Sequence, residues 1–319
     1  MTPVTVRVPA KVNLQLAVGP LRADGYHDLV TVFHAVSLFD EVTVRPAGQT
    51  SVQVTGEDAA AVPAGRTNLA VRAAAALARA AGPKRVPKPA VAIEIRKRIP
   101  VAAGLAGGSA DAAAALVACN ELWQAGLSGP ELSQVAAGVG SDVAFALLGG
   151  TAVGVGRGEQ LTVALAAGTY HWVLAFSAGG LPTPEVYATC DRLRAARAGS
   201  SDGPSRIQRP GPPQLSTALM AALRSASPSA VGPLLVNDLQ PAAISLRPGL
   251  RRTLAAGREL GAAGAMVSGS GPTCAFLAAD AGHARDLAVS LTGAGVCRAV
   301  VRVHGPVPGA AVVASTEQA

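Results

Sequence analysis

Aromatic residues are scarce in this sequence: Phe, Trp and Tyr together make up 3% of its 319 residues. Proteins that bind single-stranded nucleic acids stack the bases on aromatic side chains, and this chain has few to offer. The formal charge is +7, but the Lys and Arg residues form no long run. We therefore expect no nucleic-acid partner, and the positive charge is better suited to a small anionic substrate.

Cysteine and long apolar runs are also scarce. The cysteines are scattered, with no C-x-x-C pair: Cys119, Cys190, Cys274 and Cys297. This spacing predicts buried thiols and no metal or redox centre. Gly, Pro or charged residues interrupt every apolar run before the roughly 20 residues that span a bilayer, and the N-terminus does not resemble a signal peptide. We expect a cytoplasmic protein with no membrane partner.

Hydrophobic residues make up 50% of the chain, enough for a substantial core. Alternating apolar residues predict two strands, at 4–19 and 30–44, joined by a turn at Asp24-Gly25. Strands and helices are then mixed along the chain, with further strands expected at 90–99, 151–158 and 171–179 and helices at 67–82, 109–126, 184–197, 215–225 and 247–265. The sequence predicts an α+β protein of two domains, residues 1–160 and 161–319. The Ser-, Gly- and Pro-rich segment 198–214 predicts a mobile surface loop.

The stretch PVAAGLAGGSADAAAAL (100–116) places Gly104, Gly107 and Gly108 between an expected strand and a helix, with Ser109 as the expected N-cap. Unpaired amides and the positive end of the helix dipole can bind an anion there, although a simple tight turn is the alternative. A Walker P-loop is excluded because the chain contains no Gly-Lys dipeptide. A dinucleotide fingerprint is excluded because Ala106 interrupts the glycine spacing and two helices follow.

Three motifs, in this order, resemble those of the kinase superfamily that contains galactokinase, homoserine kinase, mevalonate kinase and phosphomevalonate kinase. They are VPAKVNLQLAV (8–18), the glycine stretch 100–116 and AMVSGSGPTCAFL (265–277). Further segments are similar to one family within it, the 4-diphosphocytidyl-2-C-methyl-D-erythritol kinases: RADGYHDL (22–29), TNLA (67–70), NELWQAGLS (120–128), GSDVAF (140–145), LPTPEVY (181–187) and NDLQP (237–241). The sequence departs from the family pattern at Ala106, Ala110 and Gln240.

The resemblance covers nearly the whole chain and implies both fold and activity. The implied fold is the two-domain α+β small-molecule kinase fold of the superfamily. The implied reaction is ATP-dependent phosphorylation of the 2-hydroxyl group of 4-diphosphocytidyl-2-C-methyl-D-erythritol, a step toward isoprenoid precursors that does not use mevalonate. ATP is then the co-substrate, and Mg²⁺ arrives with its phosphates.

Lys11 and Asp142 are the expected catalytic residues. Asp142 stands in a Gly-bounded apolar segment, where it either caps a helix or has a function. Lys11 lies within a strand among apolar residues, where it either extends to the surface or has a partner. In the family the lysine pairs with the acid, which accepts the proton of the substrate hydroxyl. Asn13 shares a strand face with Lys11 and is expected to help hold the substrate.

The resemblance assigns the cytosine ring to Tyr26, His27, Tyr187 and Thr183. The two tyrosines would stack on its faces, His27 would bind its edge and Thr183 would complete the pocket. Taken alone, Tyr26 and His27 would be ordinary hairpin residues.

For ATP, the resemblance implies that the glycine loop wraps the phosphates, with Asn68 and Lys97 near the nucleotide. Asn68 could equally cap a helix, and Lys97 is one of three adjacent basic residues, usually a solvated face. The loop residues are Pro100, Val101, Ala102, Ala103, Gly104, Leu105, Ala106, Gly107, Gly108, Ser109 and Ala110. No dedicated metal ligands are expected.

Two other functions are compatible with the motifs. One is a kinase of the same superfamily that accepts homoserine or mevalonate. The other is a catalytically silent ligand sensor, against which the presence of both Lys11 and Asp142 weighs. The sequence leaves the oligomeric state open.

Overall fold

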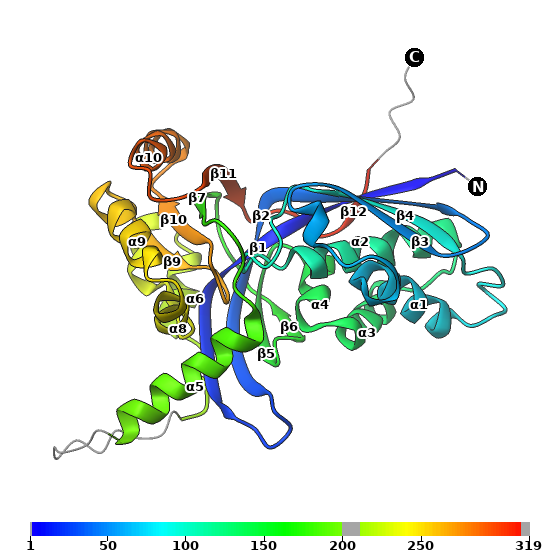
Figure 1. Cartoon of the computed structure of the whole chain (residues 1–319), viewed down its shortest axis with the longest axis horizontal. Coiled ribbons are helices and arrows are strands. Elements are labelled where there is room, and N and C mark those ends of the chain that lie inside the picture. Colours follow the sequence, from blue (N-terminus) through cyan, green and yellow to red (C-terminus); the bar gives the residue numbers. More distant parts are fainter. Residues whose placement is uncertain (1, 200–210, 314–319) are drawn as a thin grey trace.

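The computed structural model describes residues 2–199 and 211–313, and it contains two β-sheets. The larger sheet has eight strands: β1 (Val4–Leu21), β2 (His27–Pro46), β3 (Ser51–Gly56), β4 (Val91–Lys97), β5 (Thr151–Gly156), β6 (Gln160–Val163), β8 (Val236–Asn237) and β12 (Ala311–Val312). The smaller sheet has the strand order β11-β7-β10-β9, with β7 (Tyr170–Phe176), β9 (Gly264–Val267), β10 (Cys274–Ala278) and β11 (Ala299–Gly305). Figure 1 shows the smaller sheet beside the middle of the long hairpin β1–β2.

The hairpin β1–β2 is the longest element pair, and it confirms the expected turn at Asp24-Gly25. Alternate residues of β1 from Val6 to Leu14 are fully buried in the main core. Lys11 and Asn13 therefore point to the opposite face of the strand, because side chains alternate along it. Both are also buried, so the second face of β1 must meet something other than water.

Helices α1 (Leu69–Ala81), α2 (Gly107–Leu122), α3 (Gly129–Val139) and α4 (Ser141–Leu148) pack together near β1 and β2. Helix α2 contacts both strands and also α1, α3 and α4. Its alanine-rich sequence explains this central position, since small side chains on every side let neighbouring elements approach closely. The glycine loop (residues 100–110) thus leads into the most enclosed helix of this half.

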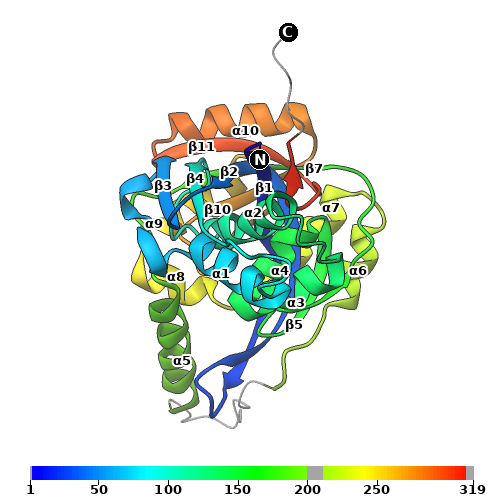
Figure 2. The ribbon, with the colours of Figure 1, turned by 90° about the vertical axis from the view of Figure 1, so that its right-hand side faces the viewer.

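The remaining helices lie around the smaller sheet and the hairpin (Figures 1 and 2). They are α5 (Thr183–Gly199), α6 (Thr217–Leu223), α7 (Pro228–Val231), α8 (Gln240–Leu246), α9 (Gly249–Glu259) and α10 (Ala281–Gly293). No helix in the described ranges is long and apolar enough to cross a membrane.

The two sheets share a hydrophobic core through β7. Tyr170, Trp172 and Leu174 belong to the same buried cluster as β1 and α2, whereas Val173 and Ala175 face the cluster beneath α9 and α10. Strands β8 and β12 also return from the second half of the chain to pair with β1. The domain boundary near residue 160 stays a prediction, and the contacts between the halves are extensive on either side of it.

The helix ends can be compared with the capping residues expected from the sequence. Helix α3 begins with a capping box formed by Ser128 and Glu131. The expected N-cap at Ser109 is wrong: the N-cap is Ala106, three residues earlier. Ala106 takes a left-handed conformation (φ 61°), and α2 begins at Gly107. Helix α2 also ends at Leu122, so Gly126 (φ 66°) belongs to the following loop and does not end the helix. The expected loop 198–214 lies mostly outside the described residues.

Candidate active site

A cavity of about 300 Å³ lies where β1, the glycine loop, α4 and α5 meet. A second cavity of about 620 Å³ lies beside it, under the tip of the β1–β2 hairpin. The two have common walls, formed by Leu29, Ser109, Asp142, Arg157, Thr183 and Tyr187. They therefore lie side by side, and together, as the joined cavities, they have a glycine-lined end and an aromatic end.

Lys11 and Asp142 face each other across the glycine-lined end. The distance from Lys11 Nζ to Asp142 Oδ2 is 3.9 Å, and Asp142 lies in the first turn of α4. Burial lowers the pKa of Lys11, and the nearby Asp142 carboxylate partly offsets that effect. The Asp142 side chain keeps 33% of its surface exposed, so its carboxylate remains accessible from the cavity.

A chain of hydrogen bonds fixes the lysine. Lys11 Nζ donates to Asn13 Oδ1 at 2.7 Å and to the Gly104 carbonyl at 3.0 Å. Asn13 Nδ2 donates in turn to the Thr31 hydroxyl, which donates to the Gln15 carbonyl. The ammonium position is thus set from both strands of the hairpin, and its distance to the carboxylate follows from this anchoring.

The glycine loop presents much of its backbone to the cavity. Ala102, Ala103, Gly104, Ala106, Gly107, Gly108 and Ser109 line it. Pro100, Val101, Leu105 and Ala110 do not, and Leu105 and Ala110 pack in the core instead. Gly104 has φ 78°, and a Cβ there would lie 2.0 Å from the Ser268 carbonyl, so this position requires glycine. The second glycine loop, with Gly269 and Ser270, closes the wall behind it.

Lys97 does not line the cavity. Its ammonium lies beneath the glycine loop, where it pairs with Asp40 and, at 2.7 Å, with Asp111 Oδ2. Asp40 Oδ1 also accepts from the backbone amides of Arg98 and Ile99, which lead into the loop. Lys97 is therefore not part of the cavity wall, and its side chain supports the loop from below. Its expected place beside the nucleotide stays a prediction.

Two carboxylates share this single buried ammonium. The ionised group of three would carry a net negative charge, which burial disfavours. Burial accordingly raises the pKa of Asp111 to about 7, although Lys97 opposes the shift. The pKa of Lys97 is raised because both carboxylates favour its charged form more strongly than burial opposes it.

Asn68 is also committed elsewhere. Its Oδ1 accepts from the Ala70 amide at 2.8 Å, and its Nδ2 donates to the Pro63 carbonyl at 2.9 Å. It is therefore the N-cap of α1, the alternative that the sequence left open. Its neighbour Leu69, rather than Asn68 itself, reaches the cavity wall.

The aromatic end brings together the residues expected to bind cytosine. Tyr26, His27, Thr183 and Tyr187 line the second cavity, and the ring centroids of His27 and Tyr187 lie 5.1 Å apart. Figures 1 and 2 both show the hairpin tip beside α5, which carries Tyr187. Half of the Tyr26 surface is exposed (53%), so its ring is free to cover a ligand.

Sequence reasoning missed four charged residues around this site. Asp191 accepts from His27 Nε2 or binds it as an ion pair at 3.0 Å, and so orients the ring. Arg157 lines both cavities, and Asp40 and Asp111 hold Lys97. A single signal in the sequence, the charge flanked by glycines in GRG (156–158), could have indicated Arg157. The partners of Lys97 required the strand register.

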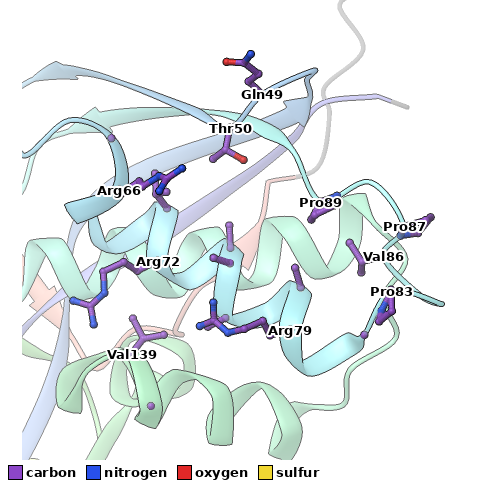
Figure 3. Close-up of a pocket in the computed structure, with 18 residues that line it drawn as sticks. Gln49, Thr50, Arg66, Arg72, Arg79, Pro83, Val86, Pro87, Pro89 and Val139 are labelled. Atoms are coloured by element: carbon purple, nitrogen blue, oxygen red, sulfur yellow. The ribbon is translucent and has the colours of Figure 1, made fainter.

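A larger cavity, of about 1170 Å³, lies elsewhere, over the outer side of α1 (Figure 3). Among the residues that the structure describes, its charged lining residues are Arg66, Arg72 and Arg79, and no carboxylate, histidine or cysteine lines it. It offers no pair of groups for acid–base chemistry. The smaller joined cavities, which contain Lys11 and Asp142, are therefore the better candidate for the active site despite their smaller volume.

The comparisons with known proteins concern the family and the fold. The model of the GHMP kinases N terminal domain matches residues 68–150, and that of the GHMP kinases C terminal matches residues 219–297. A 4-diphosphocytidyl-2-C-methyl-D-erythritol kinase of Mycolicibacterium gilvum is 56% identical over 97% of this chain and 92% of its own. One of Thermobifida fusca is 56% identical over 98% of this chain and 99% of its own. The chain belongs to the 4-diphosphocytidyl-2-C-methyl-D-erythritol kinase family.

Solved structures place this family in its wider fold. The crystal structure of a 4-(cytidine 5'-diphospho)-2C-methyl-D-erythritol kinase is 34% identical, with a TM-score of 0.72 over 94% of this chain and 98% of its own. A homoserine kinase from Cytophaga hutchinsonii has a TM-score of 0.68 at 18% identity, over 98% of each chain. The second match concerns the fold alone. The α+β small-molecule kinase fold expected from the motifs is thereby confirmed.

Proposed function

We propose that the protein transfers the γ-phosphoryl group of ATP to the 2-hydroxyl group of 4-diphosphocytidyl-2-C-methyl-D-erythritol. The observation that carries this proposal is the Lys11–Asp142 pair in the glycine-lined cavity, because Asp142 also lines the neighbouring aromatic cavity. A kinase for this acceptor needs a phosphate site, a base and a cytosine site in that order. The family membership supports the same reaction.

Asp142 is the general base of the proposed reaction. Its carboxylate is accessible from both cavities, so it can accept the proton of the attacking hydroxyl group. The adjacent Lys11 ammonium favours the ionised carboxylate and can stabilise the negative charge that develops on the attacking oxygen. Phosphoryl transfer needs little further covalent chemistry from the protein, since positioning and charge stabilisation dominate.

ATP occupies the glycine-lined end in this proposal. The first turn of α2, from Gly107 to Ser109, lies on the cavity wall, and its amides have no partner within the helix. The helix dipole adds partial positive charge at the same place. Lys97, Asp40 and Asp111 act indirectly, because they hold the loop and do not reach the cavity.

Magnesium is expected as part of the nucleotide substrate. Mg²⁺ prefers oxygen ligands, and the Ser109 hydroxyl and the Asp142 carboxylate supply them on the wall of the cavity. The ion would neutralise charge on the transferred phosphoryl group. Among the described residues, no group of three His, Cys, Asp or Glu side chains could hold a metal without the nucleotide.

The acceptor occupies the aromatic end. Tyr26 and Tyr187 can stack on a cytosine ring, and Asp191 orients His27 toward its polar edge. Neither homoserine nor mevalonate has a base that would use these rings, and this difference favours a cytidyl acceptor.

A single assay tests the proposal against its alternatives. ADP formation is measured with 4-diphosphocytidyl-2-C-methyl-D-erythritol, homoserine and mevalonate in parallel, and Asp142→Asn serves as the inactive control. Turnover with the cytidyl acceptor alone is expected. Preferential turnover of homoserine or mevalonate would replace the assigned acceptor, and ligand binding without turnover of any acceptor would favour a silent sensor.

A further inference from the structure

Arg157 occupies the junction of the two cavities. It follows β5, in the tight connection to β6, and lines both the glycine-lined and the aromatic space. Its guanidinium carbon lies 5.1 Å from the centre of the Tyr26 ring, a distance at which a cation is attracted to an aromatic face. The side chain is therefore held near the aromatic end and is still half open to solvent.

The local charge around Arg157 is incompletely balanced. Its nearest carboxylate is Glu159, with 3.9 Å between Arg157 Nε and Glu159 Oε1, and Glu159 Oε2 already accepts from the Arg157 backbone amide. The guanidinium donates no hydrogen bond to any residue in the described ranges. Five N–H donors are thus available to a ligand in the cavity.

Few cationic side chains line the joined cavities, and this limits where an anionic group of a ligand can be bound. Apart from His27, which is bonded to Asp191, the cations that line the joined cavities within the described residues are Lys11 and Arg157. Lys11 is occupied by Asn13, Gly104 and Asp142 at the glycine-lined end. Arg157 is therefore the cation available beside the cytosine-binding residues.

The proposed acceptor has its charge at the corresponding place. Its diphosphate links the cytidine to the methylerythritol, so it must lie between the aromatic residues and the base Asp142. A guanidinium fork matches phosphate oxygens with paired, charge-assisted hydrogen bonds. Resting on the proposed function, we infer that Arg157 binds the diphosphate of the cytidyl substrate and thereby selects acceptors that carry this group.

The test compares two ligands that differ only in the group to be recognised. Calorimetric titration measures the dissociation constants of cytidine and of cytidine 5'-diphosphate for the wild type and for Arg157→Met. We expect the wild type to bind the diphosphate at least about tenfold more tightly than the nucleoside, since hydrogen bonds to charged groups contribute strongly. Arg157→Met should abolish most of this ratio. Any disturbance of Tyr26 weakens both ligands alike and leaves the ratio unchanged.

Arg45→Met is the matched control, because Arg45 is also a half-exposed arginine paired with a glutamate, Glu94, but lies outside both cavities. It should keep the wild-type ratio. Arg157→Lys, which retains the charge without the planar fork, should show an intermediate ratio and also serves if the methionine variant does not fold.

Two results would overturn the inference: an unchanged ratio in both Arg157 variants, or a selective loss of affinity for ATP, which would assign Arg157 to the nucleotide. Neither result depends on turnover. If the wild type instead fails to phosphorylate the cytidyl acceptor, the proposed function fails separately, whatever the ratio for Arg157.

Discussion

Lys11 and Lys97 are both buried lysines that touch the same glycine loop, yet their surroundings differ. Lys11 contacts the loop from the cavity, with one carboxylate 3.9 Å away that is partly exposed. Lys97 lies beneath the loop between two fully buried carboxylates. Burial dominates at Lys11 and lowers its pKa, whereas the carboxylates dominate at Lys97 and raise it. The charges at Lys11 and Asp142 are therefore accessible to a ligand in the cavity, whereas those at Lys97, Asp40 and Asp111 are paired with one another beneath the loop.

The largest effect should follow a change on the cavity side. Asp142→Asn keeps the shape of the side chain but cannot accept the hydroxyl proton, so we expect kcat to fall by about 10²–10⁴-fold. The free energy of unfolding should change little, because Asp142 is a third exposed and its ion pair is long. Steady-state kinetics and urea unfolding measure the two quantities. Near wild-type turnover would remove Asp142 from the proposed mechanism.

Substitution of the two lysines by methionine tests the comparison directly. Lys97→Met leaves Asp40 and Asp111 buried without their cation, and removal of one partner of a buried pair typically costs about 3–5 kcal/mol of folding free energy. Lys11→Met leaves only hydrogen-bond acceptors and a partly solvated carboxylate, so its stability cost should stay below about 2 kcal/mol, while its activity should be lost.

Urea unfolding of both lysine variants under identical conditions provides the measurement. If Lys11→Met is the less stable of the two variants, the expected difference between the two lysines in folding stability is wrong. It is also wrong if Lys97→Met is as stable as the wild type, because the buried carboxylates would then not depend on their cation.

The stability of the protein should depend on pH through the buried carboxyl group of Asp111. The pKa of Asp111 is raised to about 7 from 3.8, so the native state holds a proton that the unfolded state has released between these values. The stabilisation from this proton is complete below about pH 4 and is lost as the pH rises through 7, by at most about 1.4 kcal/mol per pH unit. Asp111→Asn imitates the protonated form and should not show this loss.

The measurement for Asp111 is the difference in unfolding free energy between Asp111→Asn and the wild type from pH 5 to pH 8. It should increase in favour of the variant up to about pH 7 and then level off. A difference that stays constant with pH would mean that Asp111 does not titrate in this range, and that Lys97 and both carboxylates are ionised together.

The sequence predicted the cavity side of this comparison far better than the side beneath the loop. Lys11 and Asn13 share a strand face by simple alternation, and the structure joins them by a hydrogen bond of 2.7 Å. The partners of Lys97 depend on tertiary structure, since Asp40 lies on the paired strand β2 and Asp111 lies inside α2. Alternation along β4 puts Lys97 on the same face as the buried Ile93 and Ile95, but the run of basic residues at 96–98 favoured a solvated face instead.

The backbone conformation at the start of α2 could not be predicted from the sequence pattern either. Ser109 has the side chain of a good N-cap, but the chain turns into the helix at Ala106, a residue with no capping group. The loop is held two residues before Ala106, where the Gly104 carbonyl accepts hydrogen bonds from Lys11 and Ser268. Local propensity yields to these contacts, so the helix starts earlier than its residues alone favour.

The smallest effect on stability is expected from a substitution at Ala106, within the glycine loop itself. Ala106 has φ 61° and ψ 31°, a left-handed conformation that costs a residue with a Cβ about 1–2 kcal/mol. Ala106→Gly removes this strain but gives the unfolded chain more freedom, a cost of about 0.5–1 kcal/mol. We therefore expect a gain in stability of up to about 1 kcal/mol, measured by urea unfolding. Ala103→Gly is the matched control: Ala103 lies in the same loop without a positive φ, so its replacement should destabilise. Equal losses for both variants would mean that the conformation at Ala106 carries no strain, and that the loop tolerates alanine there as readily as glycine.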